Sequence, residues 1–282
     1  MNDLEGKTFV VTGANTGIGR ATVEALASRG ASRIVVASRS REKTQPVLDD
    51  LAKRNPRAEI VFVTLELGDL ASCARAADEI LAQDRPIDAL VANAGIAGLQ
   101  GITKDGFELT FGTNHLGPFL FTEKLLPLVE RAPQGRIVIV SSEGHYRCKG
   151  IDWDAQQKTT AHLTAMPEYS VSKLCNVLYA KELAWRLADT RVTTYSLHPG
   201  TVASDIWGRR LGIVASLIRP FMITNEDGAR TQLRCATAPE LTSESGLYYD
   251  KERPREPNPL AHDVALQDEL VRRSREWARP HL

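Results

Sequence analysis

The most constraining feature of the sequence is an apolar run near the N-terminus that leads through a glycine-rich turn into a helical pattern. Residues 8–11 have the composition of a buried strand, and the apolar residues after position 20 recur at helical spacing. Between them, Gly13, Gly17 and Gly19 have the spacing G-x-x-x-G-x-G. Glycines at a strand-to-helix junction allow backbone N–H groups and the helix N-terminus to approach a phosphate closely. The pattern predicts a phosphate-binding turn, with an ordinary tight turn as the alternative.

Apolar runs rich in β-branched residues alternate with helical patterns along the chain. The expected strands are residues 8–12, 34–37, 60–65, 89–92, 137–140, 193–197 and 247–249. This alternation predicts an α/β fold of the Rossmann type, a doubly wound parallel sheet of about seven strands with helices on both faces. At 282 residues, of which 43% are hydrophobic, the chain can bury one large core, so we expect a single domain over residues 1–282.

A second chemical signal is the pair Tyr169 and Lys173, four residues apart in a stretch that we expect to be helical. This spacing puts the phenol and the ammonium on one face of the helix. A nearby positive charge favours the phenolate, so we expect the pKa of Tyr169 to lie below its usual value of about 10. A tyrosine in this setting can pass a proton to or from an alcohol oxygen. The alternative is a chance match on an amphipathic helix.

Six short segments follow one another along the chain. They are the turn from Thr12 to Gly19, Asn93-Ala94-Gly95, residues 113–117 (Thr-Asn-His-Leu-Gly), Val140-Ser141-Ser142, residues 169–173 (Tyr-Ser-Val-Ser-Lys) and His198-Pro199-Gly200. Together they resemble the short-chain dehydrogenase/reductase family, and more narrowly its retinol-dehydrogenase-like branch. The resemblance extends from Lys7 to about Trp277. It implies an NAD(P)-dependent oxidoreductase that moves a hydride between a nicotinamide and a substrate carbon.

The resemblance also implies four catalytic residues, Asn114, Ser142, Tyr169 and Lys173. In the reduction direction Tyr169 would donate a proton to the forming alkoxide, and Ser142 would stabilise the charge on the substrate oxygen. Lys173 would lower the pKa of Tyr169 and hold the nicotinamide ribose. Asn114 would hold a water molecule of a proton relay, with a helix-bending or capping role as the alternative. Ser142 is preferred to Ser141 because the family's catalytic serine is the second of such a pair, and because neighbours in an extended segment face opposite sides.

The same resemblance implies which residues bind the dinucleotide. They are Gly13, Asn15, Thr16, Gly17, Ile18 and Gly19 in the turn, Ser38 and Arg39, Glu66 and Leu67, Asn93, Ala94 and Gly95, the catalytic Tyr169 and Lys173, and Pro199, Gly200, Val202 and Ser204. Glu66 stands where the family usually has an aspartate before the leucine, so Asp69 is an alternative for the adenine contact. Ser204 stands where threonine is more usual, and its hydroxyl keeps the expected contact with the carboxamide or phosphate.

The residues after the second expected strand bear on the choice of cofactor. An acidic residue there would bind the ribose hydroxyls of NAD and repel a 2′-phosphate, but residues 37–41 read Ala-Ser-Arg-Ser-Arg. Ser38 can donate a hydrogen bond to a phosphate, and Arg39 offers a delocalised positive charge. We therefore expect NADP(H) rather than NAD(H). The alternative is that Arg39 and Arg41 form a solvated surface pair.

Two long segments, residues 146–166 and 201–225, interrupt the alternation of strands and helices. Long segments in compact domains often serve as lids or binding loops, so we expect both beside the site. The second contains many large apolar residues, including Trp207 and Phe221, and Trp153 and Met166 would add to the same pocket. We expect a small lipophilic carbonyl or alcohol substrate. The second segment could equally be an amphipathic helix packed on the core.

The composition limits the other classes of partner. Lysine plus arginine equals aspartate plus glutamate, at 35 each, so the net charge of zero gives no reason to expect nucleic acid. No apolar run reaches the roughly 18 residues of a membrane span, and we expect a cytoplasmic protein without a membrane anchor. The cysteines are widely spaced, and His115, His145 and His198 lack ligand spacing, so we expect reduced thiols and no metal. The sequence is consistent with a monomer and with a homodimer.

Three functions are consistent with the sequence. The first is an NADP(H)-dependent alcohol dehydrogenase or carbonyl reductase that uses Tyr169 as general acid and base. The second is a carbon–carbon double-bond reductase of the same fold. The third is a non-enzymatic nucleotide-sensing protein, and the presence of both Tyr169 and Lys173 argues against it.

Overall fold

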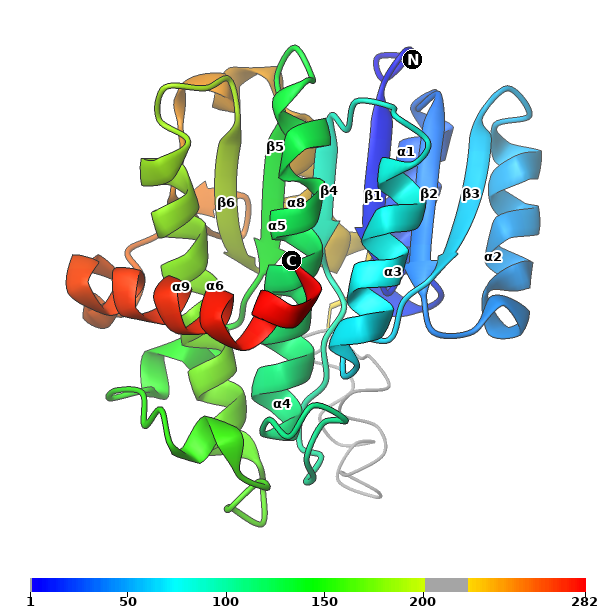
Figure 1. Cartoon of the computed structure of the whole chain (residues 1–282). Coiled ribbons are helices and arrows are strands. Elements are labelled where there is room, and N and C mark those ends of the chain that lie inside the picture. The colour runs from blue at the N-terminus through cyan, green and yellow to red at the C-terminus, as the bar shows by residue number, and fades with distance from the viewer. Residues whose placement is uncertain (1, 201–222) are drawn as a thin grey trace.

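In the part of the chain that the structure describes, a sheet of eight strands lies at the centre (Figure 1). The computed structural model describes residues 2–200 and 223–282. The strands are β1 (Thr8–Thr12), β2 (Arg33–Ser38), β3 (Glu59–Thr64), β4 (Ala89–Ala92), β5 (Arg136–Val140), β6 (Thr193–His198), β7 (Leu247–Asp250) and β8 (Arg253–Pro254). Their order is β3-β2-β1-β4-β5-β6-β7-β8, and neighbours are parallel except β7 and β8. The predicted doubly wound parallel sheet is confirmed.

The short antiparallel strand β8 is an addition to the predicted sheet. It forms through a hairpin whose two turn residues, Lys251 and Glu252, have φ values of 48° and 62°. Two-residue turns with positive φ match the twist of paired strands, but asparagine and glycine usually form them. Lysine and glutamate give no such signal, so the sequence pattern indicates only an irregular, proline-containing segment here.

Helices cover both faces of the sheet. On one face lie α3 (Leu70–Leu81), α5 (Gly117–Glu130) and α6 (Met166–Arg186), with α9 (Val264–Ala278) packed across α6 and α5 (Figure 1). On the other face lie α1 (Gly17–Ser28), α2 (Arg41–Arg54) and α8 (Asn225–Thr237). The short helical turns are α4 (Leu109–Phe111), η1 (Gly112–Leu116), η2 (Glu143–Arg147), η3 (Ala155–Gln157), η5 (Pro239–Ser243), η6 (Pro259–His262) and η7 (Arg279–His281).

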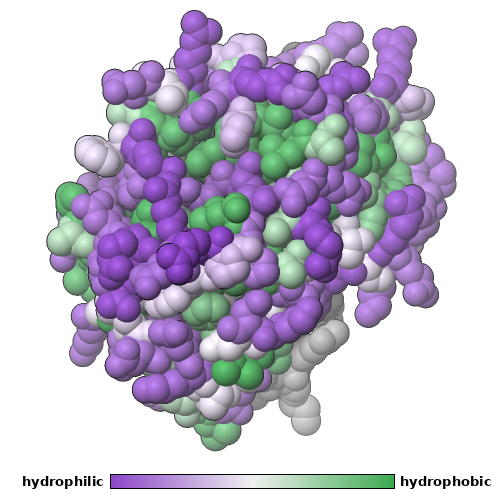
Figure 2. All heavy atoms as spheres, viewed as in Figure 1, coloured by the Kyte–Doolittle hydropathy of each residue, from purple (hydrophilic) through white to green (hydrophobic). Residues whose placement is uncertain are grey.

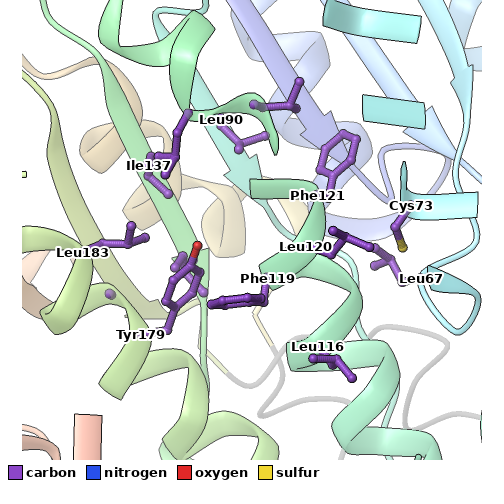
Figure 3. Packing of buried hydrophobic residues seen from close by; sticks show 14 of the residues in the cluster. Leu67, Cys73, Leu90, Leu116, Phe119, Leu120, Phe121, Ile137, Tyr179 and Leu183 are labelled. Carbon is purple, nitrogen blue, oxygen red and sulfur yellow. The ribbon is translucent and has the colours of Figure 1, made fainter. Parts of the chain in front are cut away.

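The central strands are buried on both faces. Every residue of β1 and β4 is buried, so these strands are nearly continuous apolar runs, as is usual for a parallel sheet between two layers of helices. Figure 3 shows part of the core cluster beneath α3, α5 and α6, where Phe119, Phe121 and Tyr179 pack with aliphatic side chains. The two helical layers therefore hold the strand ends in fixed positions.

On the face drawn in Figure 2, hydrophilic side chains cover most of the protein, with smaller hydrophobic areas between them. Leu99 and Ile102, in the segment after β4, are about half exposed, at 52% and 50%. Within the described ranges, no helix combines the length and the apolar character that a membrane crossing requires.

The carboxyl ends of the parallel strands form one edge of the sheet. The strand order reverses at β1, which pairs with β2 on one side and with β4 on the other. Ligands of open α/β sheets bind in the crevice outside such a reversal point. We therefore expect a ligand site between the turn after β1 and the segment after β4.

The segment 146–166 packs on the C-terminal part of the chain. The ring centres of Trp153 and Trp277 are 6.4 Å apart, and the guanidinium of Arg273 lies over the Trp153 ring at 5.2 Å. The Trp153 ring thus packs against α9 and is not among the residues that line the cleft described below, and its part in a substrate pocket stays a prediction. Most of the segment 201–225, with Trp207 and Phe221, lies outside the described residues.

Candidate active site

A cleft of about 280 Å³ lies at the carboxyl edge of the sheet. The predicted site residues that line it are Gly13, Asn15, Thr16, Gly17, Ile18, Gly19, Ser38, Arg39, Glu66, Leu67, Asn93, Ala94, Gly95, Tyr169, Lys173 and Pro199. Also lining it are Ala37, Leu65, Ile96, Thr113, Val140 and Ser141, which are not among the predicted site residues. Gly200 follows Pro199 with φ of 88°, and a side chain there would meet Ile223. Val202 and Ser204 lie outside the described residues.

The glycine turn packs tightly against the end of β4. Gly13 and Gly17 have φ values of 67° and 58°, a conformation that favours glycine. A Cβ atom at Gly19 would lie 2.5 Å from the Gly13 carbonyl oxygen and 2.6 Å from Asn93 Nδ2, so no larger residue fits. Thr16 precedes α1 without a side-chain capping hydrogen bond. The N-terminus of α1 therefore offers N–H groups to an anion in the cleft.

Thr12, the last residue of β1, joins the two strand ends. Its hydroxyl accepts hydrogen bonds from the backbone N–H groups of Asn93 and Ala94, each at 3.0 Å. Its carbonyl accepts a hydrogen bond from Asn93 Nδ2 at 2.9 Å. Asn93 and Ala94 thus lie beside the turn, and their contact with a dinucleotide stays a prediction. The bracing role of Thr12 is a new feature, and its only signal in the sequence is a polar residue that ends an apolar strand.

Ser38, Arg39 and Glu66 lie together at the ends of β2 and β3. The Ser38 hydroxyl is buried and shares a hydrogen bond of 2.7 Å with Thr44 Oγ1. Arg39 is exposed, and its Nη1 lies 3.8 Å from Glu66 Oε2, which makes a loose ion pair. The exposed guanidinium of Arg39 is therefore accessible to an anion. The Ser38 hydroxyl, in contrast, already has Thr44 as a hydrogen-bond partner.

The alternative adenine contact, Asp69, is engaged elsewhere. Its carboxylate caps α3 by accepting a hydrogen bond from the N–H of Ser72 at 3.0 Å, and it pairs with Lys104 at 2.8 Å. Asp69 is not one of the cleft-lining residues. Glu66 is, and its Oε1 accepts a hydrogen bond from the Gly68 N–H at 3.2 Å. The structure thus favours Glu66 over Asp69 as the residue for the expected contact with adenine.

Tyr169 and Lys173 face the cleft from α6. The Lys173 ammonium lies 5.7 Å from the centre of the Tyr169 ring and donates to the Val140 carbonyl at 3.0 Å. Burial lowers the pKa of Lys173 to about 8. Burial raises the pKa of Tyr169, and a side-chain hydrogen bond with Ser142 acts in the opposite direction. The expected lowering of the Tyr169 pKa is wrong for this structure, because the loss of hydration dominates.

The two serines after β5 have different partners. The buried Ser141 hydroxyl donates to the Lys173 carbonyl at 2.7 Å. The Ser142 hydroxyl accepts from the Gly144 N–H at 3.1 Å and interacts with Tyr169. A Cβ atom at Gly144 would lie 3.1 Å from a Tyr169 ring carbon, so this turn packs directly on the phenol. Ser142 is thus the serine beside Tyr169, which agrees with the choice made from alternation. Its catalytic role stays a prediction.

Asn114 lies in η1, a π-helical turn. Its Nδ2 donates to the Ile96 carbonyl at 2.9 Å and to Ser172 Oγ at 3.1 Å, and its Oδ1 accepts from the Ile96 N–H at 2.7 Å. A Cβ atom at Gly95 would lie 3.1 Å from Asn114 Oδ1 and 3.4 Å from Lys173 Nζ, so both groups border the space beside Gly95. Asn114 therefore braces the segment after β4 against α6, and its role in a proton relay stays a prediction.

The three histidines occupy packed positions. His115 Nε2 shares a hydrogen bond of 3.0 Å with Ser274 Oγ, and burial lowers the pKa of His115 to about 3. His198 is buried at the end of β6, and His145 is buried in η2. No group of three metal-binding side chains occurs in the described parts of the chain. The four cysteines are buried and unpaired.

The chain is similar to known proteins over most of its length. A family model described as short chain dehydrogenase matches residues 7–153. The chain is 38% identical to dehydrogenase/reductase SDR family member 13 of Bos taurus, over 99% of this chain and 74% of that protein. It is 39% identical to retinol dehydrogenase 12 of Homo sapiens, over 87% and 78%. A short-chain dehydrogenase of Escherichia coli CFT073 complexed with NADPH has a TM-score of 0.72 and 21% identity, over 90% of this chain and 100% of that one.

The buried ammonium of Lys173 predicts a pH-dependent free energy of unfolding. A lysine in the unfolded chain has a pKa near 10.5, whereas that of Lys173 in the folded protein is about 8. Between these values the unfolded chain binds more protons, so the free energy of unfolding should rise with pH. Relative to Lys173→Met, which lacks this titration, the wild-type protein should gain at most about 3 kcal/mol over the interval.

Urea unfolding of the two cofactor-free proteins at a series of pH values measures this difference. Lys53→Met, at an exposed position of α2, is the control and should follow the wild-type curve. A difference between wild type and Lys173→Met that stays constant with pH would contradict the burial argument.

Proposed function

The chain belongs to the short-chain dehydrogenase/reductase family, in its retinol-dehydrogenase-like branch, and we propose that it interconverts a lipophilic ketone or aldehyde and its alcohol with NADP(H). The main support is the meeting of Tyr169, Lys173 and Ser142 beside the cleft into which the glycine turn opens. A proton donor, a cation and a hydroxyl beside the cleft that the glycine turn lines suit hydride transfer to a carbonyl.

The residues of the cleft fit a nicotinamide dinucleotide. The absent side chains of Gly13 and Gly19 leave the N-terminus of α1 accessible, which suits a pyrophosphate. When bound, the cofactor supplies or accepts the hydride. We assign the adenosine to Ser38, Arg39, Glu66, Leu67, Asn93, Ala94 and Gly95, the pyrophosphate to residues 13–19, and the nicotinamide and its ribose to Tyr169, Lys173, Pro199, Gly200, Val202 and Ser204.

In the reduction direction, Tyr169 donates its phenolic proton to the substrate oxygen as the carbonyl becomes an alcohol. The raised pKa of Tyr169 keeps the phenol protonated, which this step requires. Ser142 donates a hydrogen bond to the same oxygen and stabilises the charge that develops on it. Lys173 returns a proton to Tyr169, and Asn114 connects Lys173 to solvent through a water molecule. Oxidation of the alcohol uses the same groups in reverse.

The preference for NADP(H) rests on the end of β2. Arg39 is exposed beside the cleft and can form charge-assisted hydrogen bonds with a 2′-phosphate. Its present partner is Glu66, at 3.8 Å, and a pair so loose and exposed contributes little energy that a phosphate would have to replace. The similar E. coli protein was crystallised with NADPH, which is consistent with the same cofactor here.

The lipophilic substrate class is a proposal from two observations. The name of retinol dehydrogenase 12, a relative, denotes a lipophilic alcohol. In this chain, Leu99 and Ile102 are exposed on the segment that follows the cleft residues Asn93–Gly95. The four buried, unpaired cysteines suit a reducing compartment, and the cytoplasm stays our prediction.

Tyr169→Phe should abolish turnover while NADPH binding stays intact, because it removes the proton donor and keeps the ring. The loss of a general acid should lower kcat by roughly two to four decades. NADPH fluorescence decay with a panel of lipophilic ketones and aldehydes measures the rate, and a fluorescence titration measures cofactor affinity. Tyr179→Phe is a matched control on the same helix, since the Tyr179 hydroxyl donates to Glu123 instead. Wild-type kcat in purified Tyr169→Phe would exclude the assignment.

Arg39→Asp should reverse much of the preference for NADPH over NADH. A charge-assisted phosphate contact contributes about 1.5–3 kcal/mol, or roughly one to two decades in affinity. Catalytic efficiencies with the two cofactors, measured in each variant, give the preference. Arg41→Asp is the control, because the Arg41 guanidinium lies over the Phe62 ring at 5.4 Å. Equal efficiencies with both cofactors in the wild-type protein, or the same reversal in Arg41→Asp, would argue against a phosphate contact at Arg39.

A further inference from the structure

His145 connects the turn after Ser142 with the C-terminal part of the chain. The imidazole is fully buried, with Nδ1 2.6 Å from the Ser142 carbonyl oxygen and Nε2 3.1 Å from the backbone nitrogen of Asn258. A backbone N–H can only donate, so Nε2 accepts and the ring proton lies on Nδ1, which donates to Ser142. Burial lowers the pKa of His145 to about 4, so the ring stays neutral near pH 7. One neutral imidazole therefore bridges two backbone groups that are distant in the sequence.

Asn258 uses its side chain to hold the same turn. Its Nδ2 donates to the His145 carbonyl at 2.9 Å and to the Cys148 carbonyl at 2.8 Å, while its Oδ1 accepts from the Leu260 N–H at 3.0 Å. The residue is 5% exposed. Both amide hydrogens and the amide oxygen have partners, so neither an aspartate nor an alanine could reproduce these contacts.

Further contacts join the same two segments. The Arg255 guanidinium pairs with Glu143 at 2.9 Å and lies 5.0 Å from the centre of the Tyr146 ring. The His145 ring packs against Tyr146 and Tyr248, at centroid distances of 4.0 and 4.7 Å. The hairpin of β7 and β8 brings this C-terminal segment back over η2. These contacts attach η2 to the C-terminal part of the chain in addition to the hydrogen bonds of His145 and Asn258.

We propose that His145 and Asn258 form a clamp that positions Ser142 for proton transfer with Tyr169, an inference that rests on the function proposed above. Holding the Ser142 carbonyl fixes the peptide plane that follows Cα, and so limits the directions in which the hydroxyl can point. Among the described residues, the Ser142 side chain has the Gly144 N–H and Tyr169 as partners. Neither member of the clamp lines the cleft, so both are positioning residues that act through Ser142.

The test compares kcat, KM, NADPH affinity and melting temperature in the full-length protein. His145→Leu removes both ring hydrogen bonds, and kcat should fall by about 10- to 100-fold, because a displacement of about 1 Å costs a reaction that much. His145→Asn keeps a donor near the place of Nδ1 and should recover most of the loss. Asn258→Ala should lower kcat in the same direction, and NADPH affinity should be unchanged in all three variants.

A matched control separates positioning from general destabilisation. Gln267 is also a buried amide and donates to the Ala261 carbonyl at 2.8 Å, next to the same C-terminal turn, and within the described residues it has no hydrogen bond with η2. Gln267→Ala should lower the melting temperature and leave kcat unchanged. Equal losses of kcat in Gln267→Ala and Asn258→Ala, or no rescue by His145→Asn, would overturn the clamp.

Ser142→Ala distinguishes failure of the clamp from failure of the proposed function. Loss of turnover in Ser142→Ala together with full turnover in His145→Leu would overturn the clamp alone. Full turnover in Ser142→Ala would overturn the proposed function of Ser142, and with it the role of His145 and Asn258.

Discussion

The site depends on one close approach, between the turn after β1 and the end of β4. Gly19 leaves no room for a Cβ beside the Gly13 carbonyl and the Asn93 amide, and Thr12 accepts the hydrogen bonds that hold the two strand ends together. Because the strand order reverses here, the same contact defines one wall of the cleft. The N-terminus of α1 and the segment that leads to Gly95 take their positions from it.

Burial shifts the pKa values of the two titratable groups, Tyr169 and Lys173, on the opposite wall of the cleft. The loss of hydration raises the pKa of Tyr169 and lowers that of Lys173 to about 8. A protonated phenol beside an amine with a pKa of about 8 suits the proposed delivery of one proton and reprotonation of Tyr169. The hydrogen bonds of Val140 and Ser141 hold Lys173, and the turn after β5 holds Ser142, so the sheet and α6 together position Tyr169, the proposed proton donor.

Local patterns explain why much of the fold and the cleft could be predicted. Each buried strand, and the glycine turn, is a continuous stretch of the sequence, so a local pattern is enough to predict it. The parallel topology then brings the carboxyl ends of the strands together. The contacts that the sequence could not reveal join distant segments or depend on hydration. The clamp between His145 and Asn258 needs the hairpin at Lys251, which has no turn signature. The direction of the Tyr169 pKa shift depends on burial, which a spacing of four residues does not measure.

The most direct test of the proposed reaction follows the hydride. The protein is incubated with a lipophilic enone and with NADPH in which both hydrogens at nicotinamide C4 are replaced by deuterium, and the product is analysed by mass spectrometry and NMR. Carbonyl reduction with Tyr169 as proton donor predicts an allylic alcohol with one deuterium on the carbinol carbon. A saturated ketone with deuterium at the β-carbon would contradict it, as would oxidation of the cofactor without deuterium in the organic product.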